Sequence, residues 1–373
     1  MRKERYRLIV GAFLVLTLAG GTRIHASFYP DPENVEVFVT VMPFVQRWYD
    51  DLQDELMEIG LPVFVSVPVG PETGISIRTG TAIVNGGWTP DLTGLTDIQV
   101  GLSHALRKNQ LVGYVGVNLP SGRRDFSTED YETVCRMSMN QYDFRLPVYG
   151  QGFNVAMGIN WVMPLSNFFV LGLGGGLQYK GPYKPVEEMQ GKYHPGSEII
   201  LTGGFDWQMY QTATLSGNVG ICFYQADQVG ESRVFQAGNQ TTAGLRFLQK
   251  VNFHELRILV DYLGRGKNSV AIGGALFSEA ERSTPRQWDV KIGLMASIYT
   301  GVMNLFFAEM RHFEQTPGFP GLATWGIGLA PEFRLNKQVN LHFRFKYFFG
   351  QYLQDDTIDI VGQEFSAGIT AGL

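Results

Sequence analysis

Apolar and polar residues alternate along residues 339–351, which read VNLHFRFKYFFGQ. In a β-strand, successive side chains point to opposite faces, whereas a helix would scatter the basic residues of this segment around its axis. As a strand, the segment has one apolar face and one polar face (Val339, Leu341, Phe343, Phe345 and Tyr347 against Asn340, His342, Arg344 and Lys346). The pattern therefore predicts a strand with one face toward hydrocarbon and the other toward water.

The same two-residue period recurs downstream, at residues 213–224, 256–262, 288–298 and 323–334. A soluble β-sandwich also alternates, but its strands rarely reach this length or carry so many aromatic residues near their ends. The connections provide a third criterion, because short ones alternate strictly with long ones (short near 108–110, 164–167, 210–212, 250–252, 299–301 and 336–337; long at 120–143, 181–196, 225–235, 264–286, 314–321 and 351–360). This organisation predicts an all-β fold, a transmembrane antiparallel up-and-down β-barrel, with tight periplasmic turns and long outer loops.

The N-terminus predicts export. Residues 1–7 are basic, residues 8–19 are apolar, and small residues precede Ser27, as in a signal peptide that is cleaved. A membrane-spanning helix would need about 20 apolar residues. We therefore expect a signal peptide at residues 1–26 and a barrel at residues 27–373 in the bacterial outer membrane.

The number of strands depends on the first part of the mature chain. Counting back from a last strand near residues 360–371 gives roughly 14 strands from Ile75 onward, and a pair at residues 35–45 and 61–69 would bring the barrel to about 16. Prolines 43, 62 and 68 are poor residues for a central strand, and residues 50–59 also fit a short helix. Residues 27–74 are thus either the first strand pair or a plug in the lumen.

Composition narrows the function. Charged residues make up only 17% of the chain, against roughly 25% in soluble domains. A net charge of −5 gives no basic face for nucleic acid. The mean hydropathy of −0.03 is too polar for a helical membrane protein. The expected partners are outer-membrane lipid and a small-molecule solute, and the oligomeric state is left open.

The polar faces of the predicted strands define the candidate lumen residues. We expect this set to face the solute pathway: Asp206, Arg246, Arg257, Asp261, Asp289, Lys291, Glu332, Arg334, His342, Arg344 and Lys346. Both signs occur on neighbouring strands, so the set describes either a self-neutralising polar wall or an anion site built from Arg334, Arg344 and Lys346. Residues 303–313 do not separate into one apolar and one polar face, because Phe306 and Phe307 would lie on opposite faces. Glu309 and Arg311 are therefore not assigned to either face.

Two cysteines occur in the chain. Cys135 lies in the longest predicted outer loop, and Cys222 is expected to face the lumen in the outer half of its strand. An oxidising compartment permits a disulfide between them, which would pin that loop in the mouth as a constriction. Two separate thiols are the alternative.

Neither catalysis nor a cofactor is predicted. The six histidines are scattered with no serine or acid at a telling spacing. Residues 172–176, GLGGG, lie within an apolar strand and lack the Gly-Lys-Ser/Thr of a phosphate loop. We therefore expect neither an enzyme nor a metal site.

Two short motifs resemble a known family. Residues 94–97, GLTD, precede the alternating segment IQVGLSHAL, and residues 115–122 read VGVNLPSG. Both motifs resemble outer-membrane proteins of the MetA-pathway phenol-degradation family, which are similar to FadL-type channels. The resemblance implies a barrel that passes small hydrophobic or aromatic compounds inward, although the Asn-Pro-Ala signature of the FadL hatch is missing.

Two functions therefore stay open at the level of sequence. One is a channel for passive uptake of small hydrophobic or aromatic solutes. The other is a structural or assembly barrel with a closed lumen, whose outer loops bind a partner.

Overall fold

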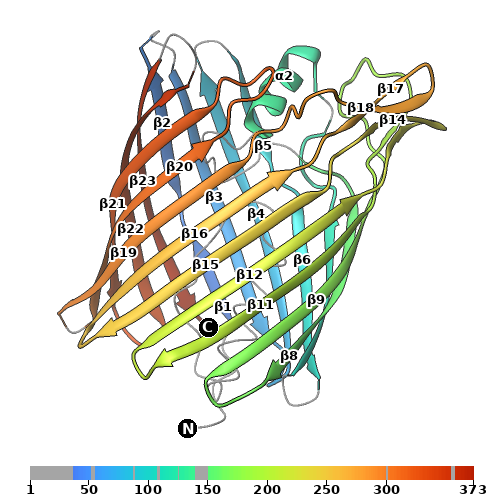
Figure 1. Ribbon diagram of the computed structural model, residues 1–373. Helices are drawn as coiled ribbons and strands as arrows, with labels where there is room; N and C mark the ends of the chain where they lie inside the picture. Colours follow the sequence, from blue (N-terminus) through green and yellow to red (C-terminus); the bar gives the residue numbers. More distant parts are fainter. Residues whose placement is uncertain are drawn as a thin grey trace.

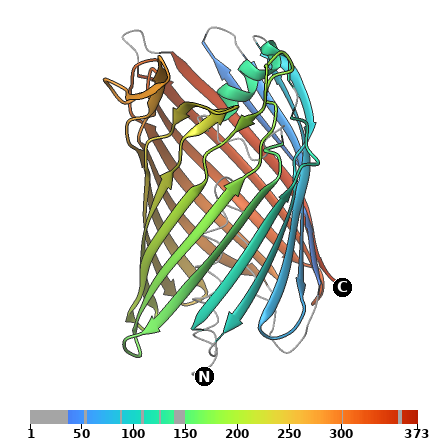
Figure 2. The same cartoon turned by 90° about the vertical axis from the view of Figure 1, so that its right-hand side faces the viewer.

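A computed structural model describes residues 37–51, 55–86, 89–106, 110–124, 126–138, 150–299, 301–353 and 358–373. The expected signal peptide lies outside these residues. The described chain is almost entirely β-structure, and its strands tilt around a closed barrel (Figures 1 and 2). The barrel closes because β23 (Asp359–Gly372) pairs with β22 (Val339–Tyr352) on one side and with the first strands of the chain on the other.

The wall has sixteen strand positions among the described residues, filled by eighteen segments. Two positions are each shared by two segments: β1 (Phe38–Val41) with β2 (Phe44–Asp50), and β5 (Thr89–Leu95) with β6 (Ile98–Leu106). All neighbouring wall strands are antiparallel, which confirms the predicted up-and-down barrel. The remaining wall strands are β3 (Glu55–Pro68), β4 (Thr73–Gly86), β7 (Leu111–Leu119), β8 (Asn154–Pro164), β9 (Phe169–Lys180), β11 (Glu198–Tyr210), β12 (Ala213–Tyr224), β15 (Gln240–Val251), β16 (His254–Arg265), β19 (Gln287–Tyr299), β20 (Val302–Phe313) and β21 (Leu322–Arg334).

The first two strand positions show how proline enters the wall. Residues 38–50 and 55–68 lie in the sheet, and a helix at residues 50–59 is wrong because β3 begins at Glu55. Pro43 falls in the break between β1 and β2, and that break lies opposite Pro62 of β3, since Val41 pairs with Val63 and Phe44 with Gly60. The two prolines thus share an interruption of the ladder, where a missing N–H costs least.

The exterior carries a belt of apolar side chains. On β22, Phe345, Tyr347 and Phe349 all face outward, and Phe345 is 43% exposed. The side chain of Phe348, between two outward-facing neighbours, points into the barrel and is 3% exposed. A Cβ at Gly362, the residue opposite Phe348, would lie 2.0 Å from the Phe348 ring, so that glycine provides the space for the ring inside.

Long loops gather at one end of the barrel and short turns at the other, where the C-terminus also lies (Figures 1 and 2). We call these the loop end and the turn end. The loop end holds α2 (Thr128–Ser138) and a small five-stranded sheet: β10 (Tyr193–His194), β13 (Asp227–Val229), β14 (Ser232–Gln236), β17 (Ser269–Ile272) and β18 (Ala275–Ser278). No helix among the described residues is long and apolar enough to cross a membrane.

An apolar cluster lies inside the barrel at the loop end. Wall strands contribute most of its members, while Phe126, Val134 and Phe319 come from the loops (the wall members are Trp48, Leu56, Ala82, Val84, Leu92, Phe313, Leu322, Phe348 and Ile360). The rings of Trp48 and Phe348 lie 4.1 Å apart between centroids. We call this the mouth cluster, because it joins α2 and its loop to the inner wall.

Candidate functional site in the barrel lumen

The strand β20, which the sequence pattern left unsorted, has a defined orientation. Phe306 faces outward and is 47% exposed, whereas Glu309 and Arg311 are buried inside, 6% and 3% exposed. Phe307 also points inward and packs over Gly328, where a Cβ would lie 2.4 Å from its ring. Glu309 and Arg311 are therefore lumen residues.

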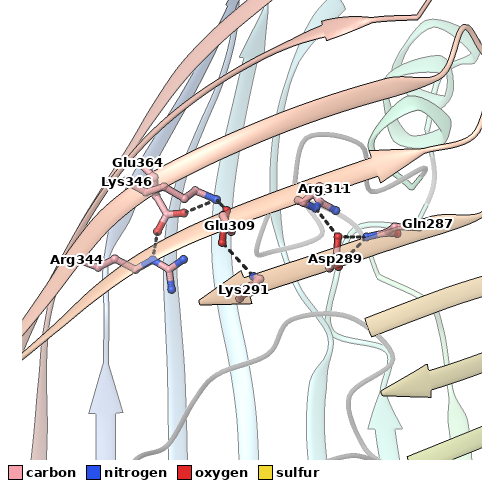
Figure 3. A network of polar contacts seen from close by, with 8 residues as sticks. All are labelled: Gln287, Asp289, Lys291, Glu309, Arg311, Arg344, Lys346 and Glu364. Carbon is pink, nitrogen blue, oxygen red and sulfur yellow. Dashed lines mark hydrogen bonds and ion pairs between the residues drawn. The ribbon is translucent and has the colours of Figure 1, made fainter. Parts of the chain in front are cut away.

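A buried lysine forms the centre of an ion network on β19 to β23 (Figure 3). Lys346 is 2% exposed, and its Nζ lies 2.9 Å from Glu309 Oε1 and 3.5 Å from Glu364 Oε2. Burial of a charge is costly unless opposite charges and hydrogen bonds compensate it, and two carboxylates surround this ammonium. Glu364, which was not among the predicted site residues, completes the network.

The network extends to both sides of this lysine (Figure 3). Arg344 Nε lies 3.1 Å from Glu364 Oε1, and its guanidinium sits 4.8 Å above the Phe307 ring. Lys291 Nζ lies 3.2 Å from Glu309 Oε2. The charges of Arg344, Lys346 and Lys291 are thus each committed to a carboxylate.

A second ion pair lies beside the first, toward the loop end (Figure 3). Arg311 Nε donates to Asp289 Oδ1 at 3.2 Å, and Gln287 Nε2 donates to both Asp289 oxygens at 3.1 and 3.0 Å. Asp289 and Arg311 are direct register partners on β19 and β20, as are Lys291 and Glu309. Taken together, four basic and three acidic side chains make this wall nearly neutral.

Arg334 does not join the predicted anion site. It ends β21 beside the turn, is exposed, and its Nε donates to the Asn336 carbonyl at 3.4 Å. The grouping of Arg334 with Arg344 and Lys346 is therefore wrong, because the turn holds Arg334 while acids hold the other two. The pattern of paired charges favours the self-neutralising wall in this part of the lumen.

Two further predicted residues have local partners. His342 Nε2 hydrogen-bonds with Thr370 Oγ1 at 2.9 Å, and its Nδ1 lies 3.8 Å from Glu332 Oε1. Arg257 Nε donates to Glu255 Oε1 at 2.5 Å on the same strand. Both sets form small polar clusters apart from the Lys346 network.

The remaining candidates lie on β11, β15 and β16. Asp206 is opposite Ser216, which is opposite Arg246 on the next strand, and Asp261 is opposite Asp289. In the described part of the chain, no ion pair is formed by Asp206 or by Arg246. Arg246 is therefore a lumen cation with an uncommitted charge.

Cys222 is a free, buried cysteine. Its Sγ lies 3.6 Å from Glu198 Oε2 as a hydrogen-bond donor, and Glu198 also pairs with Lys180. The possible disulfide with Cys135 is thus not formed in this structure, since Cys222 is free and points to a carboxylate on the neighbouring strand. Cys135 falls within α2, and its side chain lies outside the described residues.

The opposite wall of the lumen is built from small residues. On β8, β9 and β11, Asn160, Gly174 and Thr202 are register partners, and a Cβ at Gly174 would lie 2.2 Å from Asn160 Oδ1 and 2.5 Å from Thr202 Oγ1. Leu173 is 46% exposed on the outside, so the alternate glycines of the GLGGG segment face inward. The lumen is therefore asymmetric, with bulky ionic side chains on β19 to β23 and, on β8 to β11, glycines covered by the smaller polar side chains of neighbouring strands.

Part of the site was accessible from the sequence and was missed. Glu309 and Arg311 have the opposite charge to Lys291 and Asp289 at the same distances from the intervening turn, and this complementarity predicts the register that places all four inside. Glu364 offered no such signal, because the last strand, with its small residues, has a weak alternation.

The fold and the lumen together define a class of protein. A closed antiparallel barrel with an apolar belt outside and polar groups inside is a transmembrane β-barrel of the outer-membrane type. No protein-family model matches the sequence, and no curated protein sequence matches it. Among solved structures, the chain is similar in fold to three outer-membrane proteins: the anion-selective porin from Comamonas acidovorans (13% identity, TM-score 0.42, 90% of this chain and 98% of that chain covered), Pseudomonas aeruginosa OprD (8%, 0.44, 93% and 98%) and Acinetobacter baumannii OccAB1 (7%, 0.49, 91% and 96%).

Proposed function

We propose that the barrel is an outer-membrane channel for passive uptake of small solutes. The observation that carries this proposal is the asymmetry of the lumen. On the β8 to β11 wall, the small polar side chains of Asn160 and Thr202 lie over Gly174, where β19 to β23 present long ionic side chains. Such a wall leaves width for a solute, and the ionic wall opposite keeps the lumen polar.

The solute class that we propose is small hydrophobic or aromatic compounds. The resemblance of residues 94–97 and 115–122 to the phenol-degradation family supports it. A second support is that an aromatic ring lies next to the ionic wall inside the barrel, because the Phe307 ring centroid is 4.8 Å from the guanidinium carbon of Arg344. This ring offers apolar contact to a solute in an otherwise polar lumen.

Liposome swelling with neutral and aromatic solutes of graded size tests the proposal. Gly174→Leu and Gly175→Leu form a matched pair, because Gly174 faces the lumen, whereas a Cβ at Gly175 lies outside, 3.7 Å from Leu201 Cδ2. We expect swelling with the wild type and with Gly175→Leu, and slower swelling with Gly174→Leu. Absence of flux for every solute with folded wild-type barrel would contradict a channel, and equal flux through both variants would contradict the role of the wall at Gly174.

A structural or assembly barrel is the second candidate, and the loop end favours it. The β17–β18 hairpin exposes Val270, Ile272 and Phe277 on one face of the outer sheet, 44%, 66% and 54% exposed. Exposed apolar patches often mark interaction surfaces. This function predicts no flux for any solute, together with co-purification of a partner that Phe277→Ser releases.

A further inference from the structure

Arg78 lies in the lumen wall on β4, away from the ion network. Its neighbours Ala82 and Val84, at the same parity, belong to the mouth cluster inside the barrel, while Ile83 is exposed outside. Arg78 therefore points inward. Its guanidinium carbon lies 5.3 Å from the centroid of the Phe64 ring, on the neighbouring strand β3.

Arg78 differs from three other inward-facing arginines of the wall. Arg257, Arg311 and Arg344 each pair with a carboxylate within 3.2 Å. For Arg78, the described structure contains no ion pair and no side-chain hydrogen bond. A guanidinium always carries its charge, so this position holds a fixed positive charge with unused donors.

The register neighbours of Arg78 are neutral. Phe64 lies opposite on β3 and Gln99 opposite on β6, and the next inward pair is Ser76 with Gly101. The acid Asp97 precedes Gln99 by two residues, and its two oxygens accept hydrogen bonds from the Gly122 and Gln151 backbone and from the Asn118 amide. No carboxylate of the described wall is thus directed at Arg78.

Neighbouring polar groups add donors on the same patch. The Gln99 side chain is exposed to the lumen beside Arg78 and has no hydrogen bond within the described residues. At Gly101, a Cβ would lie 2.7 Å from Ser76 Oγ, so the Ser76 hydroxyl lies over this glycine in the same patch. Arginine supplies a planar pair of donors that matches a carboxylate, and the Phe64 ring supplies an apolar surface next to it.

We propose that Arg78, Gln99 and Phe64 form a binding site for small aromatic carboxylates in the lumen. Arg78 binds the carboxylate, Gln99 donates a further hydrogen bond, and the Phe64 ring contacts the ring of the solute. The site deepens the channel function proposed above and rests on it for its role in uptake. It assigns selectivity to an uncommitted arginine rather than to the basic residues of the ion network.

The test is calorimetric titration of the detergent-solubilised barrel with benzoate, and with benzamide as the neutral isostere. We expect saturable benzoate binding by the wild type and weaker or no binding of benzamide. Arg78→Gln should weaken benzoate binding roughly ten- to a hundredfold, because it removes a charged hydrogen-bonding partner. Arg78→Lys, which keeps the charge, should retain part of the affinity, and Phe64→Ala should reduce benzoate affinity more than acetate affinity.

Arg246→Gln is the matched control. It removes one uncommitted lumen charge from β15 and leaves Arg78 in place, so benzoate affinity should stay within about twofold of the wild type. No benzoate binding by folded wild type would overturn the site. Equal losses of benzoate affinity in Arg78→Gln and Arg246→Gln would also overturn it, because they would show that the summed positive charge of the lumen, not Arg78, attracts benzoate. Parallel liposome swelling separates the two proposals, because flux without binding rejects only the site, and binding without flux rejects only the channel.

Discussion

The carboxylate of Asp97 holds the backbone of Gly122. Asp97 Oδ1 accepts a hydrogen bond from Gly122 N at 2.8 Å, and Oδ2 accepts one from Gln151 N at 2.5 Å. A Cβ at Gly122 would lie 2.6 Å from the Leu95 carbonyl oxygen, so only glycine brings the backbone this close. One buried acid thus closes both ends of the loop that contains α2.

This relationship gives a physical role to the two sequence motifs that resemble the phenol-degradation family. The aspartate of GLTD is Asp97 and the glycine of LPSG is Gly122, and the two are joined by this hydrogen bond although they are 25 residues apart. Their contact anchors the loop whose Phe126 and Val134 enter the mouth cluster. The motifs therefore encode the position of a loop at the mouth.

Asp97→Ala should release this loop. The substitution leaves two partly buried backbone N–H groups without their acceptor, and each lost hydrogen bond costs about 1 kcal/mol. We expect residues 122–151 to become sensitive to protease added outside intact cells, while the barrel keeps its resistance to unfolding in SDS at room temperature. Asp91→Asn, an exposed acid on the same wall position, is the control and should leave the loop resistant. Equal protease resistance of Asp97→Ala and the wild type would show that Asp97 does not hold this loop.

The wall strands could be predicted because lipid on one side and water on the other impose a two-residue period. The limits of β12, Ala213–Tyr224, follow from this period alone. Where a large apolar side chain points inward, the period fails: Phe307 and Phe348 lie in the lumen over Gly328 and Gly362. The glycines that make room for these rings lie on neighbouring strands, so the sequence of one strand does not show that its phenylalanine points inward.

The candidate site was less accessible than the fold. Alternation places Arg344 and Lys346 inside, but it cannot tell that Glu364 and Glu309 neutralise them, because that depends on which strands are neighbours and in what register. Arg78 was missed because no acid lies opposite it. Its strand alternates weakly, and the absence of a carboxylate among the register partners of Arg78 cannot be seen from the sequence of that strand alone.

Lys346→Met should strongly destabilise the barrel. It leaves Glu309 and Glu364 buried next to each other without the shared ammonium, and breaking one side of a buried ion network costs about 3–5 kcal/mol. We expect unfolding at lower urea concentration in detergent. Lys337→Met, at an exposed turn position, should have no such effect. The double variant Lys346→Met with Glu309→Gln should recover part of the loss, and a loss that does not recover would show that packing rather than charge stabilises this position.

Phe345→Arg should impair insertion into lipid. Phe345 lies on the exterior belt in the middle of β22, where an arginine costs about 2–4 kcal/mol near the bilayer midplane. Asn340→Arg on the same strand faces the lumen near the turn end and is the matched control. Urea titration of folding into lipid vesicles measures both, and the belt predicts a large loss for Phe345→Arg only. Similar free energies of folding for the two variants would show that Phe345 does not contact hydrocarbon.

The loop that follows β18 should loosen in acid. Burial raises the pKa of Glu279, but hydrogen bonds from Ser283 and Asn268 outweigh it and hold that pKa below its ordinary value of 4.5. A depressed folded-state pKa stabilises the loop above the ordinary value, and this contribution is lost as the pH falls through the folded pKa. Amide exchange at Asn268 and Ser283, corrected for intrinsic rates, should therefore accelerate below about pH 4.5. In Glu279→Gln the acceleration should vanish, whereas Glu281→Gln should keep it, and a pH profile that is the same in both variants would contradict the assignment to Glu279.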